Sequence, residues 1–284
     1  MYSRDETVLA VLELYQQLIL HPYLPSSALI LPPSRGWPTL HRSIDSSKNP
    51  TVRSLLKHLP YLRPEKANER LCVHWETIPI NHSSDQDTGS SFAESVYPLP
   101  DHCVYLTRSV DREGTALILD TNEGIITDMG PRSHIEVPHE EYDALPLAEK
   151  WTKHRRTPIK EFLDAWTERY KKIVWMLVPN PVGRPMSGRF YSRAERPAVE
   201  EELLRLQGPW QYQVEEGVSE AIERQSKHAA DVYNTYLSYG WPDHFDKEAC
   251  RAELLDLEKI KDEDQARRMR EANPDAGMFD ESDD

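Results

Sequence analysis

The pattern of apolar and polar residues in the middle of the chain predicts three short strands joined by two tight turns. β-Branched and aromatic residues dominate each strand, as they do on a half-buried pleated surface. Both turns end in glycine, Gly114 and Gly124, which allows the positive φ that tight turns require. Consecutive apolar residues over 117–119 indicate that the middle strand is covered on both faces. The predicted strands of this antiparallel meander are residues 103–107, 115–119 and 125–128.

Apolar residues at helical spacing predict helices before and after the meander. Two of them have clear start signals, since Asn49 precedes Pro50 and Thr157 precedes Pro158, each pair forming a cap and a first-turn proline. The helix from Thr157 runs into an apolar strand over residues 173–178, which we expect to join the same sheet. The predicted helices are residues 5–20, 49–59, 157–170, 197–206, 213–239 and 246–270, and one further edge strand lies over residues 71–80.

These elements predict an α+β fold, in which helices pack an antiparallel sheet built around the meander and a helical extension follows. We expect residues 1–180 to form the α+β domain and residues 181–271 to form the helical extension, packed on or beside it. Residues 272–284 lack the apolar content needed to order themselves, so we expect a disordered acidic tail.

Charge and cysteine content narrow the function classes. The 284-residue chain carries a formal net charge of −14, which argues against general nucleic-acid binding because attraction to phosphate needs positive charge. The three cysteines match neither a disulfide framework nor a zinc site, so we expect free thiols in a reducing compartment. The first residues are no signal peptide, and no apolar run approaches the roughly 20 residues that span a bilayer. We expect a protein of the cytoplasm or nucleus that does not enter a membrane.

No strong catalytic signature occurs in the sequence, whether nucleophile elbow, phosphate loop, zinc-protease motif or dinucleotide fingerprint. One polar stretch combines the side chains that ligate zinc or iron or exchange protons. Its residues are His134, Glu136, His139, Glu140 and Glu141. The competing interpretation is that this stretch is a solvated polar connection between two elements, and we favour that interpretation. We therefore predict no catalytic residue, no metal and no cofactor.

The candidate partner-binding residues are two tryptophans and three arginines. Trp37 and Trp241 each lie in a Gly-Trp-Pro triplet, and tryptophan is enriched at binding hot spots. Such a triplet also fits a chain reversal, with Gly240 as the left-handed residue that ends a helix. The arginines follow in a predicted loop, where they could hold an anionic ligand or an acidic partner or simply be solvated. They are Arg184, Arg189 and Arg193.

Part of the chain resembles a known family. The features that carry the resemblance are Val104-Tyr105-Leu106, Leu119-Asp120-Thr121 with Gly124 and Ile126, and then Pro158, Phe162, Trp166 and Trp175. With these features the chain is similar to fungal members of the SUKH superfamily, named partly for regulators of cell-wall assembly and killer-toxin resistance. The resemblance covers about a third of the chain and implies an α+β, mostly non-enzymatic module that binds other proteins in signalling or toxin immunity. The helices after Pro197 depart from the family's pattern.

The working hypothesis is a non-catalytic interaction protein of a fungal cytoplasm or nucleus, with an unknown protein partner. Two alternatives stay open at this point. One is an enzyme of a type without a known signature, which would use acid–base residues over 134–141. The other is an accessory protein encoded beside a biosynthetic pathway.

Overall fold

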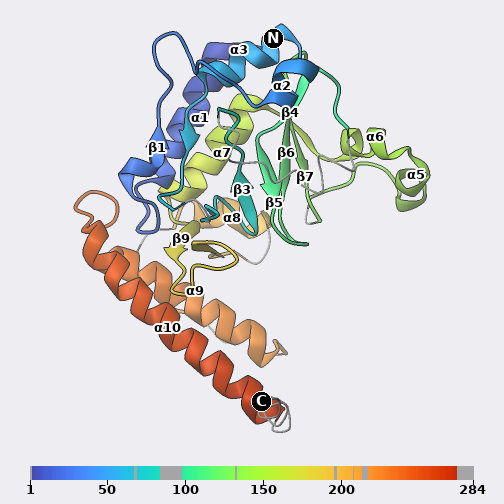
Figure 1. Cartoon of the computed structure of the whole chain (residues 1–284). Coiled ribbons are helices and arrows are strands. Elements are labelled where there is room, and N and C mark those ends of the chain that lie inside the picture. Colours follow the sequence, from blue (N-terminus) through green and yellow to red (C-terminus); the bar gives the residue numbers. More distant parts are fainter. Residues whose placement is uncertain are drawn as a thin grey trace, which may run out of the picture.

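A four-stranded antiparallel sheet in the order β4-β6-β7-β8 lies in the middle of the structure (Figure 1). The structure is a computed structural model that describes residues 2–66, 69–83, 98–131, 133–194, 197–206, 208–212 and 217–273. The strands of this sheet are β4 (Cys103–Tyr105), β6 (Ala116–Asp120), β7 (Ile125–Met129) and β8 (Arg156–Pro158). Leu119 of β6 pairs with Val104 on one side and with Ile126 on the other. The predicted three-stranded meander and the α+β fold class are therefore confirmed.

The fourth strand occupies residues that the sequence pattern assigned to the start of a helix. Thr157 pairs with Ile126 in β8, and helix α7 (Ile159–Lys171) begins only after Pro158. Pro158 itself takes the N-cap position, where no side chain bonds to the first turn. The prediction that Thr157 caps this helix is wrong, because a residue before proline is pushed towards the extended conformation that a strand also needs.

The two turn glycines serve different purposes. Gly124 has a φ of 72°, the left-handed conformation predicted for it. Gly114 is not left-handed; a Cβ added there would lie 2.2 Å from the backbone oxygen of Glu76. The prediction was therefore right for Gly124 and wrong for Gly114, where glycine is needed because another stretch of backbone approaches too closely for a side chain.

The first predicted strand continues beyond β4 and changes partner. Its continuation, β5 (Thr107–Ser109), pairs antiparallel with β3 (Thr77–Pro79), so the predicted strand over residues 71–80 is shorter than expected. The remaining short elements connect these parts of the chain. They are β1 (Leu29–Ile30), α2 (Arg42–Ser47), β2 (Tyr61–Leu62), α5 (His139–Ala144), α6 (Leu147–Lys150) and α8 (Pro197–Leu203).

The apolar strand after α7 was predicted to join the central sheet, and that prediction is wrong. It is β9 (Trp175–Pro179), which pairs antiparallel with β10 (Gly188–Ser192) in a hairpin of its own. All five residues of β9 are buried. Leu177 packs into the core that holds the central sheet, whereas Met176 and Val178 pack against the C-terminal helices. The sequence pattern predicted this apolar strand, but neither its partner strand β10 nor the C-terminal helices that cover one of its faces.

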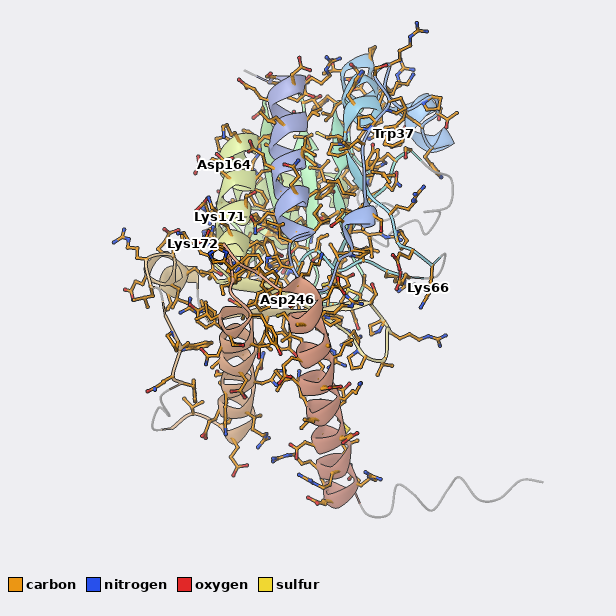
Figure 2. All side chains as sticks on the ribbon, turned by 90° about the vertical axis from the view of Figure 1, so that its left-hand side faces the viewer. Trp37, Lys66, Asp164, Lys171, Lys172 and Asp246 are labelled. Carbon is orange, nitrogen blue, oxygen red and sulfur yellow. The ribbon has the colours of Figure 1, made fainter. Side chains whose placement is uncertain are left out.

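The chain continues into two long helices, α9 (Glu220–Ser238) and α10 (Lys247–Ala272), which extend away from the sheet (Figures 1 and 2). Gly240, with a φ of 85°, follows the end of α9 in the left-handed conformation predicted for it. Asp246 caps α10 through a bond from the Ala249 amide, at 3.1 Å. The predicted helical extension is therefore present.

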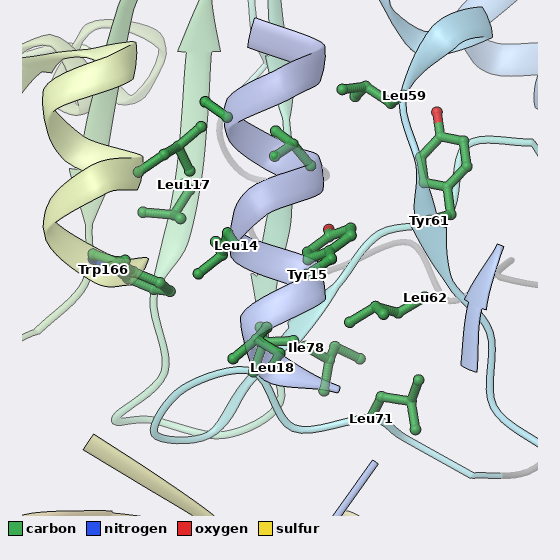
Figure 3. Packing of buried hydrophobic residues seen from close by; sticks show 14 of the residues in the cluster. Leu14, Tyr15, Leu18, Leu59, Tyr61, Leu62, Leu71, Ile78, Leu117 and Trp166 are labelled. Carbon is green, nitrogen blue, oxygen red and sulfur yellow. The ribbon is translucent and has the colours of Figure 1, made fainter. Parts of the chain in front are cut away.

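Both faces of the central sheet are covered. On one face, Leu117 and Leu119 pack in a core with helices α1 (Arg4–Leu18) and α7, where Trp166 contributes an indole ring (Figure 3). On the other face, Ile118 packs with Trp151. Helix α3 (Pro50–His58) also contributes to the larger core, and its predicted cap is confirmed by a 2.9 Å bond from the Val52 amide to the Asn49 side chain.

Polar bonds fix the C-terminal helices to the rest of the chain. The Tyr236 hydroxyl donates to the Leu177 carbonyl at 2.7 Å and also contacts the His21 ring nitrogen at 2.8 Å. Burial lowers the pKa of His21 to about 3, so this imidazole is neutral. At the start of α10, Arg251 donates to the carbonyls of Pro22 and Tyr23, both at 2.7 Å. The carbonyls just after α1 therefore accept hydrogen bonds from a side chain on α10.

The predicted domain boundary at residue 180 falls between the two paired strands of the β9–β10 hairpin. Strands on either side of that boundary thus share one ladder of backbone bonds. Most of the predicted acidic tail, residues 274–284, lies outside the described residues, and its disorder stays a prediction. No helix in the described part of the chain is both long enough and apolar enough to cross a membrane.

The two Gly-Trp-Pro triplets give a direct test of how the extension is held. We expect Trp241→Ala to lower the free energy of unfolding by about 3–5 kcal/mol, because Trp241 is buried and its indole donates to the Lys171 carbonyl. Trp37→Ala is the matched control, with an expected loss of about 1–2 kcal/mol, because this ring is only half-buried. Urea denaturation measures both values. Equal losses in the two variants would contradict this account of the docking.

Candidate functional site

An open groove in the described structure is bounded by the β9–β10 hairpin, α9 and α10. Its volume is about 1070 Å³. Trp75 and Glu76, from the segment before β3, complete its wall. The hairpin presents Met186, and α10 presents residues from Leu257 onward. The groove exists because the first half of α9 and the second half of α10 continue past the core that holds the rest of the two helices.

The part of the groove that α10 forms has an exposed apolar rim. Ile260 is 65% exposed and Met269 is 60% exposed, although both lie on a helix that buries Cys250 and Leu254 nearer its start. Cys250, Leu254, Leu257 and Ile260 recur at helical spacing, a pattern that predicts all four on the packing face of this helix. For Ile260 that prediction is wrong, because the core has ended at this level and the side chain lines the groove instead.

Positive charge is in excess along the groove. Six Lys/Arg side chains and three Asp/Glu side chains line it. Arg224 pairs with Glu220 and Arg268 with Asp264, each within one turn of its own helix. Arg184 and Lys227 also line the groove, and within the described residues neither forms an ion pair. These two cations are the ones available to a ligand.

Beneath the groove lies a closed network of charges centred on Glu258. This fully buried carboxylate accepts bonds from Arg189 at 2.5 Å, from Tyr191 at 2.9 Å and from His228 at 2.6 Å. Arg189 makes two further bonds to Asp262, at 2.8 and 2.7 Å. Arg189 therefore lines the groove while its donors are used within the chain, which makes it a support for the groove floor.

The electrostatics of this network favour a structural role. Burial alone would raise the pKa of Glu258, but the bond from His228 and the nearby Lys261 hold that pKa below its usual range. Burial also raises the pKa of Tyr191 and lowers that of Lys261, whose amine donates to the Tyr191 hydroxyl at 2.6 Å. Glu258 is thus held charged and Tyr191 protonated, as the bond between them requires, and the network can position the helices.

We expect Glu258→Gln to lower the free energy of unfolding at pH 7 by about 2–4 kcal/mol, because it removes a buried charge from three donors. Since the pKa of Glu258 is lowered in the folded state, its contribution is present above the usual carboxyl pKa and is lost as the pH falls through the folded pKa. The difference in the free energy of unfolding between Glu258→Gln and the unmodified chain should therefore become smaller at acidic pH.

Chemical denaturation at a series of pH values measures this difference. The matched control is Glu253→Gln, an exposed position on the same helix. A Glu258→Gln defect that stays constant down to pH values of about 3 would show that the carboxylate charge is not what the network stabilises.

The other predicted binding residues lie apart from the groove. Arg193 is 7% exposed, and its guanidinium lies 3.8 Å from the Tyr233 ring and 5.5 Å from the Trp210 ring. Burial lowers the pKa of Arg193. Trp241 is buried among the helices, and Trp37 lies well away from α10, with its indole bonded to the Leu59 carbonyl at 2.8 Å (Figure 2). Of the five predicted residues, only Arg184 and Arg189 are brought together.

The polar stretch from His134 to Glu141 is open to solvent, and its two histidines and three glutamates are all exposed. His139, Glu140 and Glu141 belong to α5, and this stretch forms no group of three ligand atoms close enough to share a metal ion. The neighbouring His154, missed in the sequence, is buried and bonds to Ser133 at 2.6 Å and to Tyr142 at 2.9 Å. These bonds attach α5 to the sheet.

Within the described residues, one group of side chains has the spacing of a metal site: His102, Cys103 and Asp120. Asp120 already accepts bonds from the amides of Asn122 and Glu123, at 2.8 and 3.1 Å. Burial raises the pKa of the Cys103 thiol to about 12, so the thiol is protonated in the metal-free chain. The two amide bonds to Asp120 close the turn between β6 and β7.

Asp128 on β7 is the most clearly perturbed acid in the described chain. Burial raises its pKa to about 6, against the weaker opposing effect of Arg155, and one of its carboxylate oxygens is buried without a hydrogen-bond partner. Between about pH 4 and pH 6 the folded state therefore binds more protons than the unfolded state, and stability falls as the pH rises.

We accordingly expect Asp128→Asn to raise the free energy of unfolding at pH 7, by roughly 1–3 kcal/mol, and to have little effect near pH 3.5. Thermal unfolding at the two pH values measures the change. Asp111→Asn, at an exposed turn position, is the control and should be neutral. A loss of stability at pH 7 would show that the Asp128 charge has a partner in the folded chain.

No family model matches this chain, and comparisons with curated proteins and with solved structures find no similar protein. The geometry of the groove is therefore the basis for a functional proposal.

Proposed function

We propose that this chain is a non-catalytic interaction module that binds a segment of a partner protein in the groove between the β9–β10 hairpin, α9 and α10. The observation that carries the proposal is the groove itself, with a volume of about 1070 Å³ and an exposed apolar rim. Pockets for small molecules usually reach about 300–1,000 Å³ and enclose their ligand. A groove at the upper end of this range, open along a helix, suits a peptide segment better.

The distribution of ionisable groups supports binding over catalysis. The carboxylates nearest the groove floor, Glu258 and Asp262, are bonded to Arg189. The exposed side chains that a ligand would meet include the apolar residues Ile260 and Met269, cations such as Arg184, and the carboxylate of Asp231. This combination is typical of recognition surfaces, where apolar anchors and polar rims occur together.

The resemblance to fungal members of the SUKH superfamily points in the same direction, since it implies a protein-interaction module. The residues that carry the resemblance lie in or beside the central sheet, in α7 and, for Trp175, at the start of β9, whereas the groove is formed largely by the helices after Pro197. We propose that the family-like part supplies the scaffold and that the extension supplies the binding surface.

Site-specific crosslinking tests the proposal. A photo-crosslinking amino acid replaces Gln225 or Gln265, both exposed in the groove, and a control chain carries it at Glu140 on α5. In cells of the source organism, we expect covalent adducts with a partner from the two groove positions and none from the control position. Identical adducts from all three positions, or none at all, would refute the proposal.

A second set of variants tests the apolar rim. We expect Ile260→Asp combined with Met269→Asp to abolish the adduct at Gln225, because the two substitutions remove the apolar rim that the partner would contact. Both side chains are exposed, so the fold should lose little stability. The matched control combines Leu9→Asp and Leu147→Asp, which are 55% and 52% exposed on other helices. Circular dichroism should show both double variants folded. An adduct that survives in the groove variant would contradict the assignment of the rim.

A further inference from the structure

We propose that the segment bound in the groove is an acidic amphipathic peptide, whose carboxylates face Arg184 and Lys227 and whose apolar side chains pack against Ile260 and Met269. This inference rests on the proposed function and adds the chemistry of the partner. It follows from three features of the groove: its uncompensated cations, the charge of the rest of the chain, and its exposed apolar residues.

The uncompensated cations lie on two different walls. Arg184 is on the connection between β9 and β10, and Lys227 is on α9, and both are exposed. In the described chain neither forms an ion pair, whereas Arg224, Arg268 and Arg189 each have a carboxylate partner. A peptide lying between the walls would therefore meet positive charge on both sides. Carboxylates are the protein groups that such charge-assisted contacts favour.

Because the chain as a whole is acidic, the local excess of positive charge directs an acidic partner to the groove. The net charge is −14, so most of the surface repels an acidic segment, while the groove carries six Lys/Arg against three Asp/Glu. Complementary charge of this kind fixes where and in which orientation a partner docks. It also disfavours nucleic acid, because two uncompensated cations cannot offset the repulsion between a polyphosphate and the rest of the surface.

The apolar residues specify an amphipathic rather than a purely acidic segment. Along α10 the groove runs from Leu257 to Ala272, about four helical turns or roughly 22 Å. Ile260 and Met269 form its exposed rim on that helix, whereas Met186 and Phe190 on the opposite wall are largely buried in the core. Apolar side chains of the partner would cover Ile260 and Met269, and methionine side chains adapt readily to such contacts. A free inorganic anion would leave this apolar surface exposed.

The test uses the full chain and a fluorescein-labelled peptide of about 15 residues, built from Glu, Leu and Ala so that Leu recurs at helical spacing. A second peptide replaces every Glu by Gln, and a third replaces every Leu by Ser. Fluorescence polarisation measures each dissociation constant at about 50 and 300 mM salt. We expect the first peptide to bind roughly tenfold more tightly than either control, and to lose most of that advantage at the higher salt concentration.

Charge reversal then locates the binding. Arg184→Glu combined with Lys227→Glu should weaken binding of the acidic peptide roughly tenfold or more at low salt. The matched control combines Arg35→Glu and Arg63→Glu, which changes the net charge equally at exposed positions outside the groove. We expect the control to bind within about threefold of the unmodified chain, because distant surface charges are largely screened. An equal loss in both variants would show only a general charge effect and would overturn the proposal.

Other outcomes separate this inference from the proposed function. Equal binding of the Glu and Gln peptides, or no binding of either, would overturn the acidic partner, while a crosslink at Gln225 would leave the proposed function intact. A groove-dependent dimer seen by light scattering would assign the surface to a second copy of the chain. A roughly tenfold gain in peptide affinity upon Asp280→Asn and Glu281→Gln would assign it to the chain's own acidic end. Either result would overturn the partner proposal.

Discussion

The structure depends on β9 being buried on both faces. Leu177 packs with the helices that cover the central sheet, and its neighbours Met176 and Val178 pack with α9 and α10. Because successive side chains of a strand point to opposite faces, one five-residue strand can join two apolar cores. A polar residue at any of these positions would disturb one of the two cores without a partner for its polar atoms.

The bonds around this strand explain why the C-terminal helices keep a defined orientation. Tyr236 reaches the backbone of β9 itself, at Leu177, while Arg251 bonds to the carbonyls just after α1. Buried polar groups of this kind contribute modestly to stability when they are paired, but are costly when they are left alone. They therefore select one docking geometry from the many that apolar contact alone would allow, and that geometry creates the groove.

The charge network under the groove also fixes the orientation of the C-terminal helices, at a point further from the core. Glu258 links α10 to β10 through Arg189 and Tyr191, and to α9 through His228. It holds the two helices together at the level where the apolar core between them has already ended. The apolar residues beyond that level, such as Ile260, are thereby left exposed rather than packed. The proposed binding surface is a consequence of this arrangement.

The sequence by itself determined the local structure. The meander, the helix that Asn49 caps and the left-handed residue Gly240 were all predicted, because strand alternation, capping and glycine geometry depend on neighbouring residues. Only the tertiary structure decided which strand β9 pairs with, where the core under α10 ends and which arginines meet. Arg184 and Arg189 share the groove, while Arg193, four residues further on, is buried against Tyr233. These outcomes depend on contacts between segments far apart in the chain, and no local pattern encodes such contacts.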